Sequence, residues 1–260
     1  MHDPAADTLA PLSATIAPLG LEAKEAIDAV ASMGYRAVQW SATQPGMRPR
    51  DLDASMRRGV AAHLRRLGLS CSGVDLFIPG AHFVEPAHID RAIDAVAQAS
   101  SLAVALGRCA VHLALPEPDA SAPGRCDEAV RAICEIADRE HLLVVDYSVG
   151  ALEASARDQG SPLRVGIDPA VLIAAGHDAP LAVGRAGVRL GGARVCDLLQ
   201  GATRAPVGEA IDGRLDLAAY RAALTVVGLR TSPVADARQW SNPGGGLLRT
   251  LDRWQQGVIA

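Results

Sequence analysis

The stretch Leu142-Leu143-Val144-Val145-Asp146 decides the fold, because it is a short apolar run that ends in a carboxylate. A run of four or five apolar residues between turn-forming segments is typical of a buried strand in a parallel sheet. Runs of this kind recur along the chain about every 30 residues, the length of one βα unit. The predicted strands are Ser13–Ile16, Ala37–Ser41, Leu69–Leu76, Ala110–Leu115, Leu142–Tyr147, Arg164–Asp168, Ala193–Cys196 and Thr231–Asp236.

The segments between these runs have the spacing of amphipathic helices. Ile89, Ile93 and Val96, for example, fall on one helical face. Strands that alternate with helices over 260 residues suit a (β/α)₈ TIM barrel, whose typical length is about 250 residues. A doubly wound sheet is the alternative, but no Gly-rich phosphate-binding motif follows the first strand. We therefore expect one TIM-barrel domain over residues 1–260.

The composition excludes several classes of partner. A net charge of −4 gives no excess of basic residues to neutralise a nucleic-acid backbone, and three Trp, three Tyr and two Phe offer few stacking platforms. No apolar run approaches the ~18 residues that a membrane span needs, and the N-terminal residues lack the pattern of a secretory signal. The five cysteines form no CxxC pair, so neither a disulfide framework nor a structural zinc site is expected. We expect a cytoplasmic protein that binds neither nucleic acid nor membrane.

Polar side chains gather where the predicted strands end, which is where the active sites of TIM barrels lie. An ionisable residue at the end of an apolar run is unusual, because burying an unpaired charge is costly. Several such residues on one rim indicate a polar site, although each could instead hydrogen-bond loop amides or cap a helix. The strand-end residues are Trp40, Ser41, Asp75, His112, Asp146, Asp168, Arg194, Asp197 and Asp236.

Several segments resemble a known family in their order and spacing. They are Gly34-Tyr35-Arg36-Ala37-Val38-Gln39-Trp40, His82-Phe83, Val165-Gly166-Ile167-Asp168-Pro169, and the stretch from Arg194-Val195-Cys196-Asp197 to Pro206-Val207-Gly208-Glu209. Together they are similar to the xylose isomerase-like TIM barrels, often described as sugar phosphate isomerases/epimerases. The resemblance extends over most of the chain, from the first strand to the last helix.

The resemblance implies a barrel mouth with a divalent metal, Mn or Zn, held by two glutamates, an aspartate and a histidine. The two glutamates also act as acid and base on a keto-sugar. In this sequence the matching carboxylates are Asp146, Asp168 and Asp236, and the first and last of them are the expected catalytic residues. Among the strand-end residues, we expect His112, Arg194, Asp197 and Trp40 to bind the substrate.

This sequence departs from the family at the metal ligands. Arg194 stands where the family has a histidine, and an arginine offers only donors, so it is not an ordinary metal ligand. Three converging carboxylates repel one another without a cation. Either a metal is still bound by the three aspartates, or the guanidinium of Arg194 replaces the metal in a hydrogen-bonded ion pair. We favour the second arrangement.

Two functions from different classes follow. The first is an isomerase or epimerase that acts on a small sugar or polyol by carboxylate acid/base chemistry. The second is a barrel that has lost this chemistry and binds a polar metabolite or a partner without turnover. An endonuclease acting on abasic DNA would need a histidine-rich metal cluster, for which only His112 is well placed.

Overall fold

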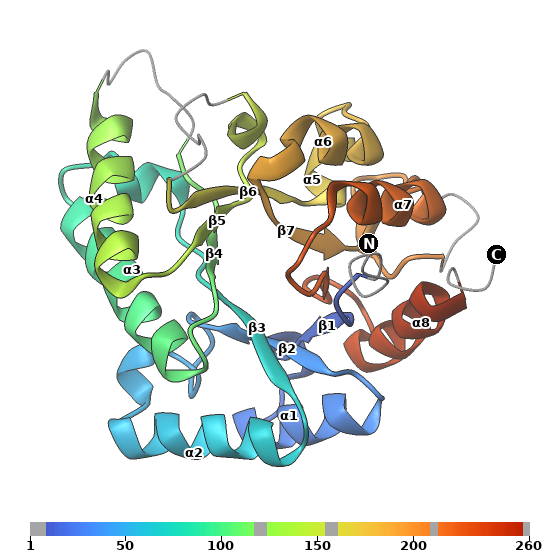
Figure 1. Ribbon diagram of the computed structural model, residues 1–260, viewed down its shortest axis with the longest axis horizontal. Coiled ribbons are helices and arrows are strands. Elements are labelled where there is room, and N and C mark those ends of the chain that lie inside the picture. Colours follow the sequence, from blue (N-terminus) through green and yellow to red (C-terminus); the bar gives the residue numbers. More distant parts are fainter. Residues whose placement is uncertain (1–8, 117–123, 154–160, 209–212, 257–260) are drawn as a thin grey trace, which may run out of the picture.

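The apolar runs predicted as strands form a closed barrel of parallel strands in the order β1-β10-β7-β6-β5-β4-β3-β2 (Figure 1). This closure confirms the predicted TIM barrel, since a doubly wound sheet would be open. The computed structural model describes residues 9–116, 124–153, 161–208 and 213–256. The barrel strands are β1 (Ser13–Thr15), β2 (Ala37–Ser41), β3 (Ser70–Asp75), β4 (Val111–Leu113), β5 (Val144–Asp146), β6 (Leu163–Ile167), β7 (Leu190–Val195) and β10 (Val234–Ala235).

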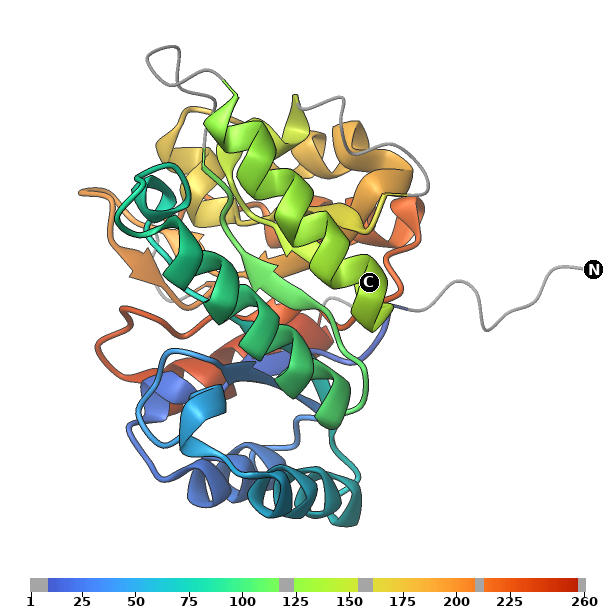
Figure 2. The same ribbon diagram turned by 90° about the vertical axis from the view of Figure 1, so that its left-hand side faces the viewer.

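Helices surround the barrel (Figure 1), and α3 and α4 run side by side along one flank (Figure 2). They are α1 (Ala23–Ser32), α2 (Ala54–Arg66), α3 (Ile89–Ala105), α4 (Arg125–Glu140), α5 (Pro169–Ala174), α6 (Ala179–Ala186), α7 (Leu217–Val227) and α8 (Pro243–Gln256). Short 3₁₀ turns occur as η2 (Ala17–Leu19), η3 (Pro49–Asp51), η4 (Gly80–Phe83), η5 (Val149–Leu152) and η6 (Gly187–Arg189). No helix within the described ranges is long and apolar enough to cross a membrane.

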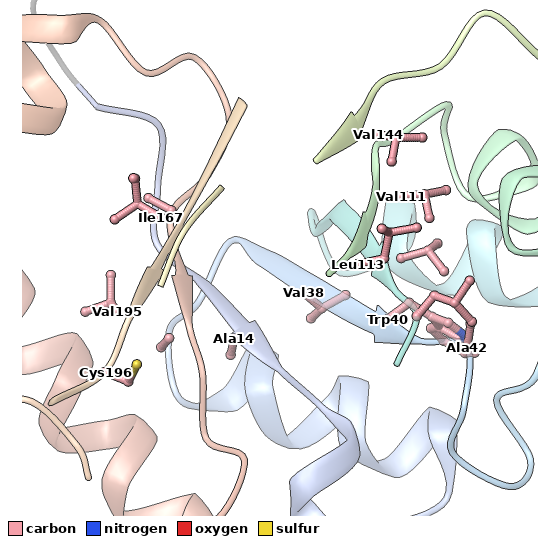
Figure 3. Packing of buried hydrophobic residues seen from close by; sticks show 14 of the residues in the cluster. Ala14, Val38, Trp40, Ala42, Val111, Leu113, Val144, Ile167, Val195 and Cys196 are labelled. Atoms are coloured by element: carbon pink, nitrogen blue, oxygen red, sulfur yellow. The ribbon is translucent and has the colours of Figure 1, made fainter. Parts of the chain in front are cut away.

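The main hydrophobic core lies between the barrel and the helices. Successive side chains of a strand point to opposite faces, so every second residue of each strand faces the helices. Val38, Val111, Val144 and Val195 are fully buried members of this layer, and Figure 3 shows them on their strands. The residues between them in sequence face the inside of the barrel, where many of the polar residues lie.

Two features of the fold differ from the sequence-based expectation. Strand β7 begins at Leu190, three residues before the predicted start, because Gly191 and Gly192 pass close to the side chains of Arg164 and Tyr147 and leave no room for a side chain there. After β7, the chain forms a two-stranded antiparallel hairpin of β8 (Asp197–Leu198) and β9 (Arg204–Ala205). The loop of this hairpin contains Gly201 at a φ of 83°, but the two strands are only two residues long, too short to give the alternating pattern that predicts strands.

Candidate functional site

Arg194 on β7 joins carboxylates that lie at the ends of three other strands, β3, β6 and β10. Its Nη1 donates to Asp168 Oδ2 at 2.8 Å, and its Nη2 donates to Asp75 Oδ1 at 2.9 Å. The Nε atom lies 3.6 Å from Asp236 Oδ2. The guanidinium also stacks over the ring of Tyr147, 4.1 Å from its centroid. Arg194 is therefore the hub of a buried ion-pair network at the carboxyl ends of the strands.

Two further arginines complete this Asp–Arg network. Arg204 Nη2, from the β8–β9 hairpin, donates to Asp236 Oδ2 at 2.7 Å and to Asp168 Oδ2 at 3.1 Å. Arg238, just beyond β10, donates from Nε to Asp236 Oδ1 at 2.8 Å and from Nη2 to Asp75 Oδ1 at 3.1 Å. Three aspartates thus face three arginines, and their formal charges cancel.

The network changes the protonation equilibria of its members. Burial by itself raises the pKa of Asp168, but Arg194 and Arg204 outweigh it and hold that pKa well below its ordinary value. Burial also raises the pKa of Asp75. The positive charges of Arg238 and Arg194 outweigh this effect, so the pKa of Asp75 is lowered. Both carboxyls are therefore ionised at neutral pH, which makes them ready proton acceptors but weak bases.

His112 lies beside the Asp–Arg network, inside the barrel. Gln39 Nε2 donates to His112 Nδ1 at 2.8 Å, and the Tyr147 hydroxyl is 3.3 Å from the same nitrogen. A Cβ at Gly73 would be 2.5 Å from His112 Nε2, so the imidazole fits only because that residue is glycine. Burial lowers the pKa of His112 to about 4. The ring is therefore neutral at pH 7.

Acidification is expected to reduce stability through His112 before the aspartates contribute. The unfolded imidazole titrates near ~6.5 and the folded one near 4, so the unfolded chain binds the extra proton between these values. Between pH 7 and 4.5 this difference lowers the free energy of unfolding by roughly 2–3 kcal/mol. Urea unfolding of wild type and His112→Gln at both pH values measures it, and the variant should lose less stability. Equal losses in the two proteins would contradict this assignment.

Asp146 lies on the other face of its strand. It alternates with Val145, which packs with Tyr147 inside the barrel, so Asp146 shares the outward side of β5 with Val144. Its Oδ1 accepts hydrogen bonds from the backbone N–H of Leu115 and of Ser148, both at 2.9 Å. The structure thus brings Asp168, Arg194 and Asp236 together, while Asp146 ties down the loops after β4 and β5.

Asp197 and Trp40, two of the expected substrate-binding residues, make hydrogen bonds that hold the fold together. Asp197 Oδ1 accepts from the backbone N–H of Arg214 at 2.8 Å and of Leu215 at 2.9 Å, which fixes the segment before α7. Trp40 is fully buried in the helix-facing core, and its indole N–H donates to the carbonyl of Met47 at 2.8 Å. Trp40 also borders the cavity at the barrel mouth. Glu209 lies outside the described residues.

A cavity of about 470 Å³ opens at the barrel mouth, next to the network. Its charged lining residues are Asp75, Asp236 and Arg238, and Thr15, Gln39 and Ser41 add uncharged polar groups. This volume falls within the usual range of small-molecule sites, roughly 300–1,000 Å³. The mouth cavity is therefore the candidate binding site.

The sequence analysis missed Arg204 and Arg238, and it gave Asp75 no specific role. Asp75 is among the strand-end residues that indicated a polar site, but neither catalysis nor substrate binding was assigned to it. Arg238 falls on the same side of the chain as Asp236, two residues earlier, so the strand alternation could have identified it. Arg204 gave no signal, since it belongs to a hairpin that was not predicted and is one of many arginines in the chain.

The comparison with protein families confirms the resemblance seen in the sequence. Residues 27–146 match the family described as xylose isomerase-like TIM barrel. A search of curated protein sequences gives no significant match.

Solved structures with a similar fold include an L-ribulose 3-epimerase, with 15% identity, a TM-score of 0.76, and coverage of 96% of this chain and 95% of the epimerase. A D-psicose 3-epimerase from Clostridium cellulolyticum H10, solved with D-tagatose, has 15% identity, a TM-score of 0.73, and coverage of 96% and 97%. A probable 3-DHS dehydratase, AsbF, from Bacillus anthracis has 10% identity, a TM-score of 0.74, and coverage of 95% and 99%. At these identities the similarity establishes the fold.

Proposed function

We propose, from the match of this barrel to the xylose isomerase-like family, that the chain isomerises a small sugar or related polyol at the mouth cavity, and that arginine replaces the metal. The observation that carries the proposal is the lining of that cavity. Asp75, Asp236 and Arg238 line the same space of about 470 Å³, and the side chains of Asp75 and Arg238 are 14% and 28% exposed, whereas that of Asp236 is fully buried beneath them. A carboxylate and a cation in one cavity are what proton transfer next to a carbonyl group requires.

The donor set at the mouth does not suit the divalent metal that the family resemblance implies. Arg194 and Arg204 both donate to Asp168 Oδ2, so two guanidinium groups hold the carboxylate oxygen that a cation would need. Asp146, another expected ligand, lies on the outward side of β5. A metal would have to displace both arginines, whose charges already balance the aspartates. The proposed chemistry therefore involves only side chains of the protein itself.

Asp75 is the best-placed base. Its Oδ1 accepts hydrogen bonds from Arg194 and Arg238, whereas no donor among the described residues reaches its Oδ2. In the proposed step, Asp75 Oδ2 takes the proton from the carbon next to the carbonyl, and the C–H electron pair moves to give an enediolate. Arg238, held by Asp236 and Asp75, stabilises the negative charge on the enediolate oxygen. The hydroxyl proton of the enediolate then passes to the former carbonyl oxygen, and Asp75 returns its proton to the former carbonyl carbon, so that the neighbouring carbon becomes the new carbonyl.

A single available carboxylate oxygen favours isomerisation over epimerisation. An epimerase must deliver a proton to the face opposite the one from which it was removed, which requires a second acid. Both oxygens of Asp236 accept hydrogen bonds from arginines, so this residue positions Arg204 and Arg238 and does not act as that acid.

The second candidate function is ligand binding without turnover. The observation that favours it is the lowered pKa of Asp75, which Arg238 and Arg194 cause against the effect of burial. A carboxylate with a lowered pKa is a weaker base, and the rate of proton abstraction falls with basicity. The same cavity would then retain a polyol without reacting with it.

Solvent exchange distinguishes the two functions. The purified protein is incubated in D₂O containing EDTA with a panel of aldoses and ketoses, each free and phosphorylated, and deuterium uptake is followed by NMR. We expect uptake at the carbon next to the carbonyl of at least one sugar, with formation of its isomer. A sugar that raises the melting temperature without exchange would establish binding alone. Exchange that appears only after Mn²⁺ is added would show that arginine does not replace the metal.

A further inference from the structure

We propose that His82, Glu85 and His88, the His–Glu–His cluster, bind a transition-metal ion of the zinc class outside the barrel mouth. The cluster lies in the loop between β3 and α3, on η4 and the turn that follows it. Each of the three side chains offers one ligand atom, and these atoms all lie within 4.8 Å of one another. Two imidazoles and one carboxylate form a ligand set that Zn²⁺ uses in sites that keep a fourth position open.

One ligand–ligand distance within the cluster is close to that of a bound site, and all three ligand atoms lie within 4.8 Å of one another. His88 Nε2 lies 3.5 Å from Glu85 Oε2. Two ligands that each lie about 2.0–2.1 Å from a tetrahedral zinc are about 3.3–3.4 Å apart. The two imidazole rings are neighbours, with centroids 4.5 Å apart. Rotation about side-chain bonds is therefore enough to close the ligand set around an ion.

The backbone holds the three residues in this arrangement. The Glu85 N–H donates to the carbonyl of Ala81 at 3.0 Å, and the Glu85 carbonyl accepts from the His88 N–H at 2.9 Å. Phe83 lies between His82 and Glu85 in the sequence. It is fully buried and anchors the segment in the core. The site is thus preorganised, and binding need not order a loose loop.

Basic residues surround the His–Glu–His cluster and determine which ligand charge a cation needs there. His82 and His88 line a cavity of about 420 Å³ together with Arg48, Arg50 and Arg91, and no acidic residue is among its described lining residues. The arginines repel a cation, so the negative charge of Glu85 is essential and two imidazoles alone would bind weakly. The cavity borders both histidines, so it has room for water or an anion as the fourth ligand.

The test is titration of the full-length chain, after EDTA treatment and its removal, with Zn²⁺ by calorimetry and with Co²⁺ by visible absorption. We expect saturable binding of one ion per chain and a Co²⁺ spectrum typical of nitrogen and oxygen ligands in a tetrahedral site. His82→Gln, Glu85→Gln and His88→Gln should each weaken Zn²⁺ binding at least about tenfold, because the loss of an outer-shell partner alone already weakens it about 10–100-fold.

His177→Gln is the matched control, since His177 is exposed and lies outside the cluster; its affinity for Zn²⁺ should equal that of wild type. Glu85 is exposed, so the fold of Glu85→Gln is expected to be intact, and its melting temperature checks this. The proposal fails if wild type binds no Zn²⁺, or if all three cluster variants bind like wild type. Binding lost only in Asp168→Asn would place the metal at the barrel mouth and also overturn it.

Discussion

Replacing Arg194 with alanine is expected to lower the free energy of unfolding by about 3–5 kcal/mol. The guanidinium is only 7% exposed and contacts three carboxylates, of which Asp168 and Asp236 are at most 1% exposed. Its removal leaves buried negative charges that Arg204 and Arg238 compensate only in part. Urea unfolding at pH 7 measures the loss, with the slope of the transition compared between the two proteins.

The control for this prediction is Arg139→Ala on α4, where the side chain is 65% exposed and only 3.9 Å from Glu140. A pair of this kind contributes at most about 1 kcal/mol. The double variant Arg194→Ala/Asp168→Asn should be less unstable than the sum of the single variants, because the asparagine side chain carries no charge to be left unpaired. If Arg194→Ala loses less than about 1 kcal/mol, the network is solvated and does not stabilise the barrel.

The fold could be predicted because its signal is repeated. Each strand is a short apolar run, and the runs recur at the spacing of a βα unit, so an error at one strand does not change the architecture. Apart from the β8–β9 hairpin, which was not predicted, the errors lie at the strand boundaries. The sequence pattern places Gly191 and Gly192 outside the strand because glycine disfavours strands, yet the interior of the barrel requires small residues beside Tyr147 and Arg164.

The sequence predicted the position of a candidate residue correctly only where that residue both ends a strand and lies on the inner face of the barrel. Asp168, Arg194 and Asp236 all fall on the inner face and meet in the Asp–Arg network. Asp146 also ends its strand, but it lies one residue out of phase with the inward-facing positions. A difference of one residue places a side chain on the opposite face of the strand. Sequence order alone does not reveal this shift, because both faces of β5 are apolar up to that residue.

The partners of the three aspartates depend on contacts that are distant in sequence. Arg204 reaches Asp168 across 36 residues, and Arg238 reaches Asp75 across 163. The sequence did predict that a cation must lie among the carboxylates, since their mutual repulsion requires one. It could not show that three arginines share this role, because the chain has 25 basic residues and nothing in their local pattern distinguishes these three.

The largest expected effect on activity is that of Asp75→Asn, which should reduce the rate of deuterium exchange by about 10²–10⁴-fold. The amide of asparagine keeps the size of the carboxylate and can still accept from Arg194 and Arg238, but it cannot take a proton from carbon. Substrate affinity should therefore change much less than the rate. The measurement is the exchange rate at saturating sugar, determined by NMR, together with KM.

Asp146→Asn is the matched variant, since it makes the same chemical change at the carboxylate that the sequence analysis expected to be catalytic. An asparagine side-chain oxygen still accepts from the N–H groups of Leu115 and Ser148, so the exchange rate should stay within a few-fold of wild type. A large loss in Asp146→Asn with a small one in Asp75→Asn would make Asp146 the base. Equal losses in both would mean that the effect comes from disturbed loops at the barrel mouth, and Asp75 would then be a positioning residue.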